Sequence, residues 1–168
     1  MAKETNKKIW KNIYTNINTA DLPWCVETIP DWFKGVIKSK WIKPCKTMDV
    51  GCGIGNFANY LAENGFEVTA IDFVSEVIAI AKKKFSHKNL KFKIYDALEL
   101  KLLKEKFDFI FEISLLHNIV PSQRASYVEG LYSRLNKNGK LMICCFSDQE
   151  LIFGGKKIYL DAQTGNTM

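Results

Sequence analysis

The sequence predicts an α/β fold with a doubly wound parallel sheet that is covered by helices on both faces. Short apolar, β-rich segments alternate with segments of helical periodicity along most of the 168 residues. The connections between successive strand segments are long enough for crossovers, which parallel strands require. No internal repeat or low-complexity segment interrupts the alternation. Together these observations favour one domain, 1–168, with a core of its own.

The first 44 residues carry two helical patterns ahead of the alternating region. Apolar side chains recur at helical spacing over residues 1 to about 20, namely Ile9, Trp10, Ile13, Tyr14 and Ile17. Residues 21–24 break this pattern, and a second helix is predicted to begin at Asp31 and to end before Pro44. We expect residues 1–44 to form a helical lid over the core at 45–146.

The core opens with a short apolar strand ending in Asp49, followed by Gly51, Gly53 and Gly55 at alternate positions. A helix begins with the residues after Asn56. Glycine removes the Cβ atom that would keep a ligand away from the main chain and tolerates the positive φ of a tight turn. The amino end of the helix adds main-chain N–H groups and a positive dipole. We therefore expect this loop to hold a polar or anionic group against the main chain.

The remaining elements follow in regular order. Further strands are expected at 66–71, 90–95, 107–113 and 140–146. Helices are expected from Ser75, which is predicted to cap its helix, over 98–103, and from Pro121, with a turn at 136–139 before the last strand. A short strand at 157–160 is expected within an otherwise weakly ordered tail, 147–168.

Composition limits the class of protein. There is no apolar run near the roughly 20 residues that a bilayer span needs, and no apolar signal core follows Met1. Five cysteines without a CxxC pair, and only two histidines, indicate reduced thiols in the cytoplasm and no metal site. The net charge of +6 is spread along the chain, so the lysines at 82–84 indicate a solvated helix end better than a nucleic-acid surface.

Polar residues follow the other strands at the points where a doubly wound sheet binds ligands. Asp72 ends the second strand, Asp96 the third, and residues 114–118 follow the fourth. An acidic residue 21 positions after Gly51 suits hydrogen bonding to a ribose diol, which indicates a cofactor that contains a nucleoside. Asp72 and Asp96 could also act only as caps of the elements that follow.

Two such cofactors compete at this stage. A dinucleotide site favours a third glycine where this chain has Asn56. Asp49 would also place negative charge beside a pyrophosphate, whereas a sulfonium with an amino-acid tail carries positive groups.

At these residues the chain resembles the class I S-adenosylmethionine-dependent methyltransferases. The resemblance rests on four motifs at successive strand ends, covering roughly residues 45 to 146: Asp49 to Gly55, Ile71-Asp72, Tyr95-Asp96-Ala97, and Phe107 to Glu112 leading to Leu116-His117-Asn118. It implies a Rossmann-like methyltransferase fold with strand order 3-2-1-4-5. The cofactor would be S-adenosylmethionine, with S-adenosylhomocysteine as product.

The resemblance also implies roles for individual residues. Gly51, Gly53 and Gly55 would lie against the methionine and ribose portions, and Asp72 would hold the ribose hydroxyls. Asp96 would accept from the adenine amino group, with the Ala97 amide near the ring edge. Ser114 and Leu115 would line the methyl-donor pocket. The full cofactor-binding set is expected to be Asp49, Gly51, Cys52, Gly53, Gly55, Asn56, Asp72, Phe73, Asp96, Ala97, Ser114 and Leu115.

Residues near the acceptor are less strongly specified. His117 is a candidate general base, because its ordinary pKa suits neutral pH, but a residue at this place can also serve only to shape the pocket. Tyr14, Trp24, His117 and Asn118 are expected to face the substrate, although Tyr14 and Trp24 could equally be packing residues. Methyl transfer depends heavily on placement of the acceptor, so no clear base is required.

Three functions remain open from the sequence. The first is methyl transfer to a small molecule; the Pro23-Trp24 turn resembles family members that act on thiols, halides or metalloids. The second is methylation of RNA or protein, and the third is cofactor binding without turnover. The family usually adds two further strands after the fifth, for which few residues remain. We therefore expect either a shortened form or a sheet that ends early, with part of the substrate wall missing.

Overall fold

A computed structural model of the chain describes residues 2–146, 152–153 and 156–157. Its sheet has five strands in the order β3-β2-β1-β4-β5, and every neighbouring pair is parallel, which confirms the predicted fold class. The strands are β1 (Lys46–Val50), β2 (Glu67–Asp72), β3 (Leu90–Ile94), β4 (Phe107–Ile113) and β5 (Leu135–Cys144). The chain order reverses between β1 and β4, so the carboxyl ends of these two strands flank the switch point.

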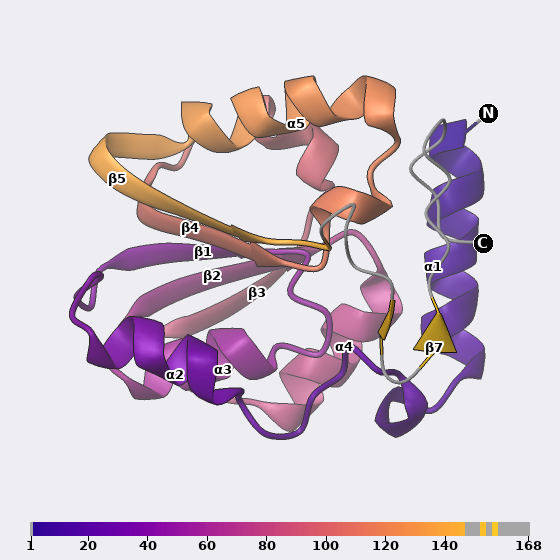
Figure 1. Cartoon of the computed structure of the whole chain (residues 1–168), viewed down its shortest axis with the longest axis horizontal. Coiled ribbons are helices and arrows are strands. Elements are labelled where there is room, and N and C mark those ends of the chain that lie inside the picture. The colour runs from indigo at the N-terminus through magenta and orange to yellow at the C-terminus, as the bar shows by residue number, and fades with distance from the viewer. Residues whose placement is uncertain (1, 147–151, 154–155, 158–168) are drawn as a thin grey trace.

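Helices cover both faces of the sheet (Figure 1). On one face lie α2 (Asp31–Lys38), α3 (Asn56–Glu63) and α4 (Ser75–Lys84), whose buried side chains pack with Phe109 and Phe111 of β4. On the other face, α5 (Pro121–Ser133) and the 3₁₀ segment η2 (Ala97–Leu102) pack against Met48, Val50 and Ile110. The three central strands, β1, β2 and β4, are buried along nearly their whole length, as a sheet covered on both faces requires.

The first helix stands apart from these layers. Helix α1 (Ala2–Asn16) lies beyond the carboxyl ends of the strands (Figure 1), and the 3₁₀ segment η1 (Thr19–Asp21) follows it. Its Tyr14 is buried with Ile54 of the glycine loop and Val77 of α4. Helix α2, in contrast, buries Phe33 in the core beneath the sheet. Within 1–44, the segment before α2 and Trp32 in the first turn of α2 lie over the carboxyl edge, and Phe33 packs beneath the sheet.

Two local predictions differ from the structure. The predicted turn at 136–139 lies inside β5 as an irregularity: Phe107 pairs with Leu135, and Phe109 already pairs with Lys140. Asn138 has φ of 64°, which lets the chain return to register within the same strand. Ser75 is the first residue of α4 and does not cap it, because its hydroxyl donates to the Glu76 carboxylate. The cap position is Val74, whose amide donates to Asp72 Oδ1.

Beyond β5 the described residues form only β6 (Ile152–Phe153) and β7 (Lys156–Lys157), which pair antiparallel with each other. The strand predicted at 157–160 overlaps β7 at Lys157, and residues 158–160 lie outside the described residues. Within the described part of the chain, no helix is long and apolar enough to span a membrane.

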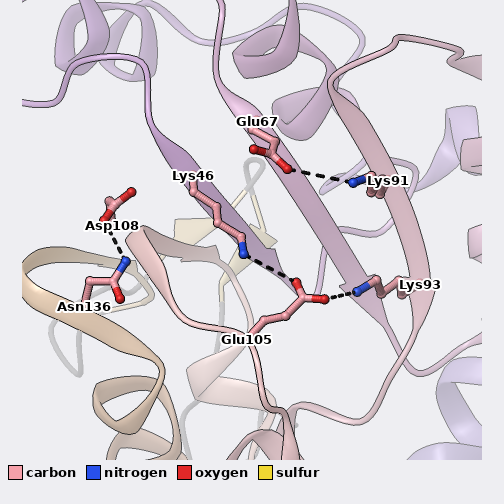
Figure 2. Close-up of polar contacts among 7 residues, drawn as sticks. All are labelled: Lys46, Glu67, Lys91, Lys93, Glu105, Asp108 and Asn136. Carbon is pink, nitrogen blue, oxygen red and sulfur yellow. Dashed lines mark hydrogen bonds and ion pairs between the residues drawn. The ribbon is translucent and has the colours of Figure 1, made fainter.

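Ion pairs join strands β1, β2 and β3 to one another and to the loop before β4, away from the switch point (Figure 2). The Lys46 ammonium of β1 and the Lys93 ammonium of β3 both point to the Glu105 carboxylate, at 3.9 and 2.9 Å. Glu67 of β2 lies 3.8 Å from Lys91 of β3. These lysines are therefore engaged with nearby acids, and such exposed pairs each stabilise the fold by only about 0–1 kcal/mol.

Candidate functional site

A cavity of about 760 Å³ opens at the carboxyl ends of β1, β2 and β4. The glycine loop after β1 and the residues that end β2 form one part of its wall, and the segment after β4 forms another. The first 32 residues contribute the side opposite the sheet. Nine of the twelve residues predicted to bind the cofactor line it: Asp49, Gly51, Cys52, Gly53, Asn56, Asp72, Phe73, Ser114 and Leu115. All four residues predicted to face the substrate line it as well: Tyr14, Trp24, His117 and Asn118.

The glycine loop is shaped by close approach at two of its three glycines. Gly51 and Gly53 have φ of 72° and 52°, values that side chains rarely adopt. A Cβ atom on Gly51 would lie 3.0 Å from the Leu115 side chain across the cavity, and one on Gly53 would lie 3.4 Å from the Tyr14 hydroxyl. Gly55 does not line the cavity; a Cβ atom there would lie 2.6 Å from the Phe92 ring. The third glycine therefore allows α3 to pack against the sheet.

The main-chain N–H groups of the loop are largely engaged within the protein. The amides of Gly51 and Cys52 both donate to the Ile71 carbonyl, at 2.8 and 2.9 Å, and the Gly55 amide donates to the Cys52 carbonyl at 2.9 Å. The Gly53 amide donates to Asp72 Oδ2 at 3.2 Å. At these four amides the loop thus offers the cavity few free N–H donors, which favours a polar group over an anionic one among the ligands that the glycine spacing predicts.

Three acidic side chains are buried around this end of the sheet. Asp49 is 4% exposed, Asp72 is 9% exposed, and Glu112 is fully buried. Burial raises the pKa of all three carboxyl groups, and the pKa of Asp49 is raised further by the neighbouring charges of Asp72 and Glu112. Mutual repulsion and desolvation of this kind are relieved by a ligand that brings positive charge.

The Asp72 carboxylate joins the glycine loop to the start of α4. It accepts from the Gly53 amide through Oδ2 and from the Val74 amide through Oδ1, the latter at 3.0 Å. These two hydrogen bonds partly offset the effect of burial on its pKa. A carboxylate has about four acceptor positions, so two bonds to main-chain amides leave capacity for a further donor.

Asp96 and Ala97 lie beside the main cavity, in the wall of a smaller one of about 60 Å³. Phe73 and Leu115 line both cavities, so the two cavities lie side by side. Asp96 Oδ1 accepts from the Leu98 amide at 2.9 Å, and Asp96 Oδ2 lies 2.8 Å from the Lys7 ammonium of α1. Asp96 therefore caps η2, which is the alternative to a cofactor-binding role, and it also pairs with the Lys7 ammonium of the N-terminal helix.

The segment after β4 is held in an unusual conformation by Glu112. Its buried carboxylate accepts from the Leu115 amide at 2.7 Å and from the Leu116 amide at 3.3 Å. Ser114, which lies between Glu112 and Leu115 in the chain, has φ of 64°. The Asn118 side-chain amide donates to the Ser114 carbonyl at 2.7 Å. The 3₁₀ segment η3 (Leu116–Asn118) follows directly. Glu112 and Asn118 thus fix the wall that faces the glycine loop.

His117 is neutral in this environment. Burial, together with the nearby Arg124, lowers the pKa of its imidazole to about 4. Nδ1 accepts from the Phe146 amide at 3.4 Å, and the two rings stack with centroids 4.3 Å apart. With Nδ1 accepting, the proton of a neutral imidazole resides on Nε2. The ring is therefore a wall residue with a low affinity for protons.

An aromatic cluster from the N-terminal segment covers the glycine loop. Trp24 Nε1 donates to the Tyr14 hydroxyl at 3.0 Å, and Trp10 lies against both rings, with centroids 5.4 Å from Trp24 and 6.2 Å from Tyr14. Burial raises the pKa of Tyr14 well above its usual value, so its hydroxyl is neutral. Tyr14 and Trp24 thus pack in a cluster, and both also line the cavity; that they face a substrate stays a prediction.

Asn56 serves the loop mainly as a tether. Its side-chain N–H donates to the Val26 carbonyl of the N-terminal segment, and its carbonyl accepts from the Lys84 ammonium of α4 at 3.0 Å. The residue that replaces the third glycine of a dinucleotide motif therefore fastens residues before α2 to the glycine loop and α4.

Comparison with known proteins identifies the family. The family described as "Methyltransferase domain" matches residues 47–139, which is more than half of the chain. The chain belongs to this methyltransferase family. The matched range covers the glycine loop, Asp72, Asp96 and the segment after β4.

Relatives of this methyltransferase chain match it over part of their length. It is 30% identical over 109 residues to phosphoethanolamine N-methyltransferase 2 of Caenorhabditis elegans, covering 62% of this chain and 24% of that protein. It is 27% identical over 116 residues to the probable S-adenosyl-L-methionine-dependent methyltransferase TehB of Haemophilus influenzae, covering 67% of this chain and 40% of that protein. The chain thus spans less than half the length of these two relatives.

Solved structures of methyltransferases share the fold. The N-methyltransferase NodS from Bradyrhizobium japonicum, in complex with S-adenosyl-L-homocysteine, superimposes with a TM-score of 0.65 at 21% identity, covering 82% of this chain and 71% of that one. TehB from Haemophilus influenzae superimposes with a TM-score of 0.59 at 24% identity, covering 71% and 42%. At these identities the likeness shows the fold.

Sequence reasoning missed several residues that build the site of this methyltransferase chain. The sequence assigns no role to Glu112. The only signal for a role is its position at the end of a strand that leads into the site. Lys7 gave no signal, because one lysine in a lysine-rich helix is unremarkable in sequence. Cys144, Cys145 and Phe146 line the cavity at the end of β5, which follows from the topology once five strands are assumed.

Proposed function

We propose that this chain binds S-adenosylmethionine in the 760 Å³ cavity and transfers its methyl group to a small-molecule acceptor. When bound, the cofactor supplies a methyl group activated on a positively charged sulfur. The observation that carries the proposal is the charge of the wall. Asp49 and Asp72 lie beside the glycine loop, and no lysine or arginine is among the described residues that line the cavity.

This charge distribution suits a sulfonium cofactor better than a dinucleotide. S-adenosylmethionine carries a sulfonium, an ammonium and one carboxylate, so its net charge is positive at neutral pH. A pyrophosphate would require N–H donors or cations, and the amides of Gly51, Cys52 and Gly53 already donate to Ile71 and Asp72. Binding of the positive group would lower the raised pKa of the buried carboxyl groups, which supplies part of the binding free energy.

The residues divide into three groups by what they would do. Gly51 and Gly53 would let the cofactor approach the main chain, and Asp72 would accept from the ribose hydroxyls. Asp96 and the Ala97 amide would meet the adenine ring after a rearrangement of Lys7. Ser114 and Leu115, held by Glu112, would orient the methyl group toward the acceptor. His117 would form the acceptor wall as a neutral ring.

Calorimetry on the full chain tests the cofactor. We expect S-adenosylhomocysteine and S-adenosylmethionine to bind, and NAD to bind much more weakly or not at all. An absence of affinity for S-adenosylhomocysteine by the folded chain, or tighter binding of NAD, would refute the proposal.

A second candidate function is cofactor binding without turnover. It is supported by the length of the match, since the chain spans only 40% of TehB and residues from elsewhere could complete the acceptor wall. A screen for methyl transfer from labelled S-adenosylmethionine, run on this chain and on a longer form where one exists, separates an enzyme from a binding protein.

Methylation of RNA or protein is less well supported, because the basic side chains lie outside the lining of the cavity. The cytoplasm remains the predicted location, and all five cysteines are free thiols in the structure.

A further inference from the structure

We propose that the acceptor is a neutral nucleophile of low polarity, such as an aromatic ring nitrogen, and that anionic acceptors are rejected. This inference rests on the proposed function, because it concerns the acceptor side of the same cavity. It goes further by naming the charge and polarity of the substrate.

The first observation is the contrast between the cavity and the rest of the molecule. The chain carries a net charge of +6, yet the charged side chains among the described residues of the cavity wall are Asp21, Asp49 and Asp72. Lys46 and Lys93 are engaged with Glu105 outside the cavity (Figure 2). Lys84 and Arg124 contact wall residues without lining the cavity: Lys84 donates to Asn56 Oδ1, and Arg124 donates to the His117 carbonyl. Among the charged side chains that line the cavity, a carboxylate, phosphate or thiolate acceptor would meet only carboxylates.

The second observation is the scarcity of N–H donors that could hold an anion in place of a cation. The glycine-loop amides donate to Ile71 and Asp72, and the amides of Leu115 and Leu116 donate to Glu112. Trp24 Nε1 donates to the Tyr14 hydroxyl. These main-chain and indole donors on both sides of the cavity are thus already engaged within the protein.

The third observation is the aromatic and thiol character of the remaining wall. Its rings include Trp10, Tyr14, Trp24, Trp32, Phe57 and Phe146. Four of the five cysteines also line it, namely Cys25, Cys52, Cys144 and Cys145, and burial raises the pKa of each thiol so that it stays uncharged. Flat apolar molecules pack well against such walls, and the faces of the rings favour a developing positive charge.

The charge balance of the reaction gives the physical reason for the selection. When a neutral ring nitrogen attacks, its lone pair forms the new N–C bond, the S–C bond breaks, and the electron pair of that bond returns to sulfur. The unit of positive charge moves from sulfur to nitrogen and no proton is released, so the carboxylates stabilise the charge throughout. An anionic acceptor would cancel the charge in the transition state, and the same carboxylates would then stabilise the ground state more than the transition state.

This reaction also needs no general base. A ring nitrogen or a thioether carries no proton that must leave, which agrees with a neutral His117 whose pKa is about 4. The bound cation would favour the ionised form of the buried Asp49 and Asp72 carboxyl groups, whose pKa values burial raises.

Matched acceptors test the inference directly. Pyridine and nicotinate share one nucleophilic nitrogen and differ by a carboxylate, and thioanisole and 4-(methylthio)benzoate make the same comparison at a thioether sulfur. With labelled S-adenosylmethionine and the full chain, we expect kcat/KM to be at least about tenfold higher for the neutral member of each pair. Phosphoethanolamine should be a poor acceptor. Equal or faster turnover of nicotinate or 4-(methylthio)benzoate overturns the inference, whereas failure to bind S-adenosylhomocysteine would overturn the proposed function itself.

The cavity thiols provide a second readout that does not depend on finding an acceptor. Methanethiosulfonates that carry a trimethylammonium or a sulfonate group modify thiols with opposite sensitivity to the local field. Relative to Cys45, which lies outside the cavity, we expect Cys144 and Cys145 to be modified about tenfold faster by the cationic reagent than by the anionic one. Equal rates, or faster modification by the sulfonate, overturn the inference even when none of the acceptors is turned over.

A substitution isolates the contribution of the wall. Asp21→Asn should reduce the preference for the cationic reagent at Cys145 by roughly threefold, because it removes one exposed carboxylate of the cavity wall. Glu67→Gln is the matched control, since Glu67 pairs with Lys91 on the strands away from the cavity (Figure 2). An equal effect of both substitutions would show that only the overall charge matters and would overturn the inference.

Discussion

The main-chain amide of Gly53 donates a hydrogen bond to Asp72 Oδ2 at 3.2 Å, and this contact links the loop after β1 to the end of β2. Both residues line the cavity, so one carboxylate positions the glycine loop and also faces the space where the ribose would lie. The Asp72 side chain is therefore expected to matter for ligand binding more than its contribution to stability suggests.

Replacing Asp72 by asparagine tests this dual role. Asp72→Asn keeps one oxygen for a main-chain amide but removes the charge and an acceptor that a ribose hydroxyl would use. We expect the Kd for S-adenosylhomocysteine, measured by calorimetry, to rise roughly 10- to 100-fold, since hydrogen bonds to charged groups contribute about 1.5–3 kcal/mol.

Asp31→Asn is the control for that substitution. The Asp31 carboxylate is almost fully exposed at the start of α2 and pairs with Lys34. The Asp31→Asn substitution should leave the Kd for S-adenosylhomocysteine unchanged. A similar loss of affinity in both variants would mean that net charge, and not the Asp72 contact, governs binding.

Gly53 and Gly55 of the loop should respond differently to alanine. Gly53→Ala adds a Cβ atom to the cavity side near the Tyr14 hydroxyl, so it should weaken ligand binding and cost about 1–2 kcal/mol of stability through its positive φ. Gly55→Ala would bring a Cβ atom to 2.6 Å from the Phe92 ring, so it should lower stability by more, roughly 2–4 kcal/mol. Chemical denaturation together with calorimetry separates the two effects.

Gly35→Ala is the matched control on a regular helix. Gly35 lies inside α2, and a Cβ atom there would meet nothing within 4 Å. Alanine should therefore stabilise the chain by about 0.5–1 kcal/mol and leave binding unchanged. If Gly53→Ala behaved in the same way, the positive φ and the close approach at the loop would have no consequence.

The sequence predicted the layers of the fold because hydrophobic periodicity is a local signal, and β1 to β4 follow it to within a residue or two. The strand ends placed Gly53, Asp72 and Ser114 in one cavity because parallel strands meet at the same edge. The engagement of the loop amides could not be predicted, because it depends on how closely β2 approaches the loop. Nor could the pairing of Asp96 with Lys7, which joins residues 89 positions apart and has no periodic signature.

Glu112 gives the chain a predictable response to pH. Burial raises the pKa of its carboxyl group from 4.5 to about 7, so between those values the folded state binds more protons than the unfolded state. Its contribution to stability is thus fully present below pH 4.5 and is lost as the pH rises to 7, by about 3 kcal/mol. Asp49 and Asp72, whose pKa values are also raised, act in the same direction.

Glu112→Gln removes this one titration. Urea denaturation at several pH values should show a smaller fall in the free energy of unfolding from pH 4.5 to 7 in the variant than in the parent chain. Asp49 and Asp72 act in the same direction in both chains. An unchanged slope would mean that Glu112 is already ionised, or still protonated, across this range. The variant also leaves one of the Leu115 and Leu116 amides without its acceptor, so binding should weaken severalfold.

His117 should not appear in the pH profile of the reaction. Its pKa of about 4 keeps the imidazole neutral from pH 5.5 to 8, and its Nδ1 accepts from the Phe146 amide. His117→Asn can supply an oxygen in place of Nδ1, so we expect kcat to stay within about threefold of the parent value, with no change in the shape of the pH–rate curve. A loss of 100-fold or more, together with the loss of an ionisation between pH 5.5 and 8, would instead identify His117 as a general base.

The contact between Lys7 and Asp96 should oppose binding of an adenine ring. The Lys7 ammonium lies 2.8 Å from Asp96 Oδ2 and 5.8 Å from the centre of the Phe73 ring, where it lines the smaller cavity with both residues. An adenine amino group that donates to Asp96 must displace this ammonium. Lys7→Gln should therefore raise the affinity for S-adenosylhomocysteine by up to about fivefold, the range of a partly exposed ion pair. The effect should shrink as salt screens the pair in the parent chain. Lys8→Gln, at an exposed position one residue further along α1, removes the same charge and should leave the affinity unchanged. Weaker binding in Lys7→Gln would show that Lys7 contacts the ligand itself and that α1 contributes to the adenine site as it stands.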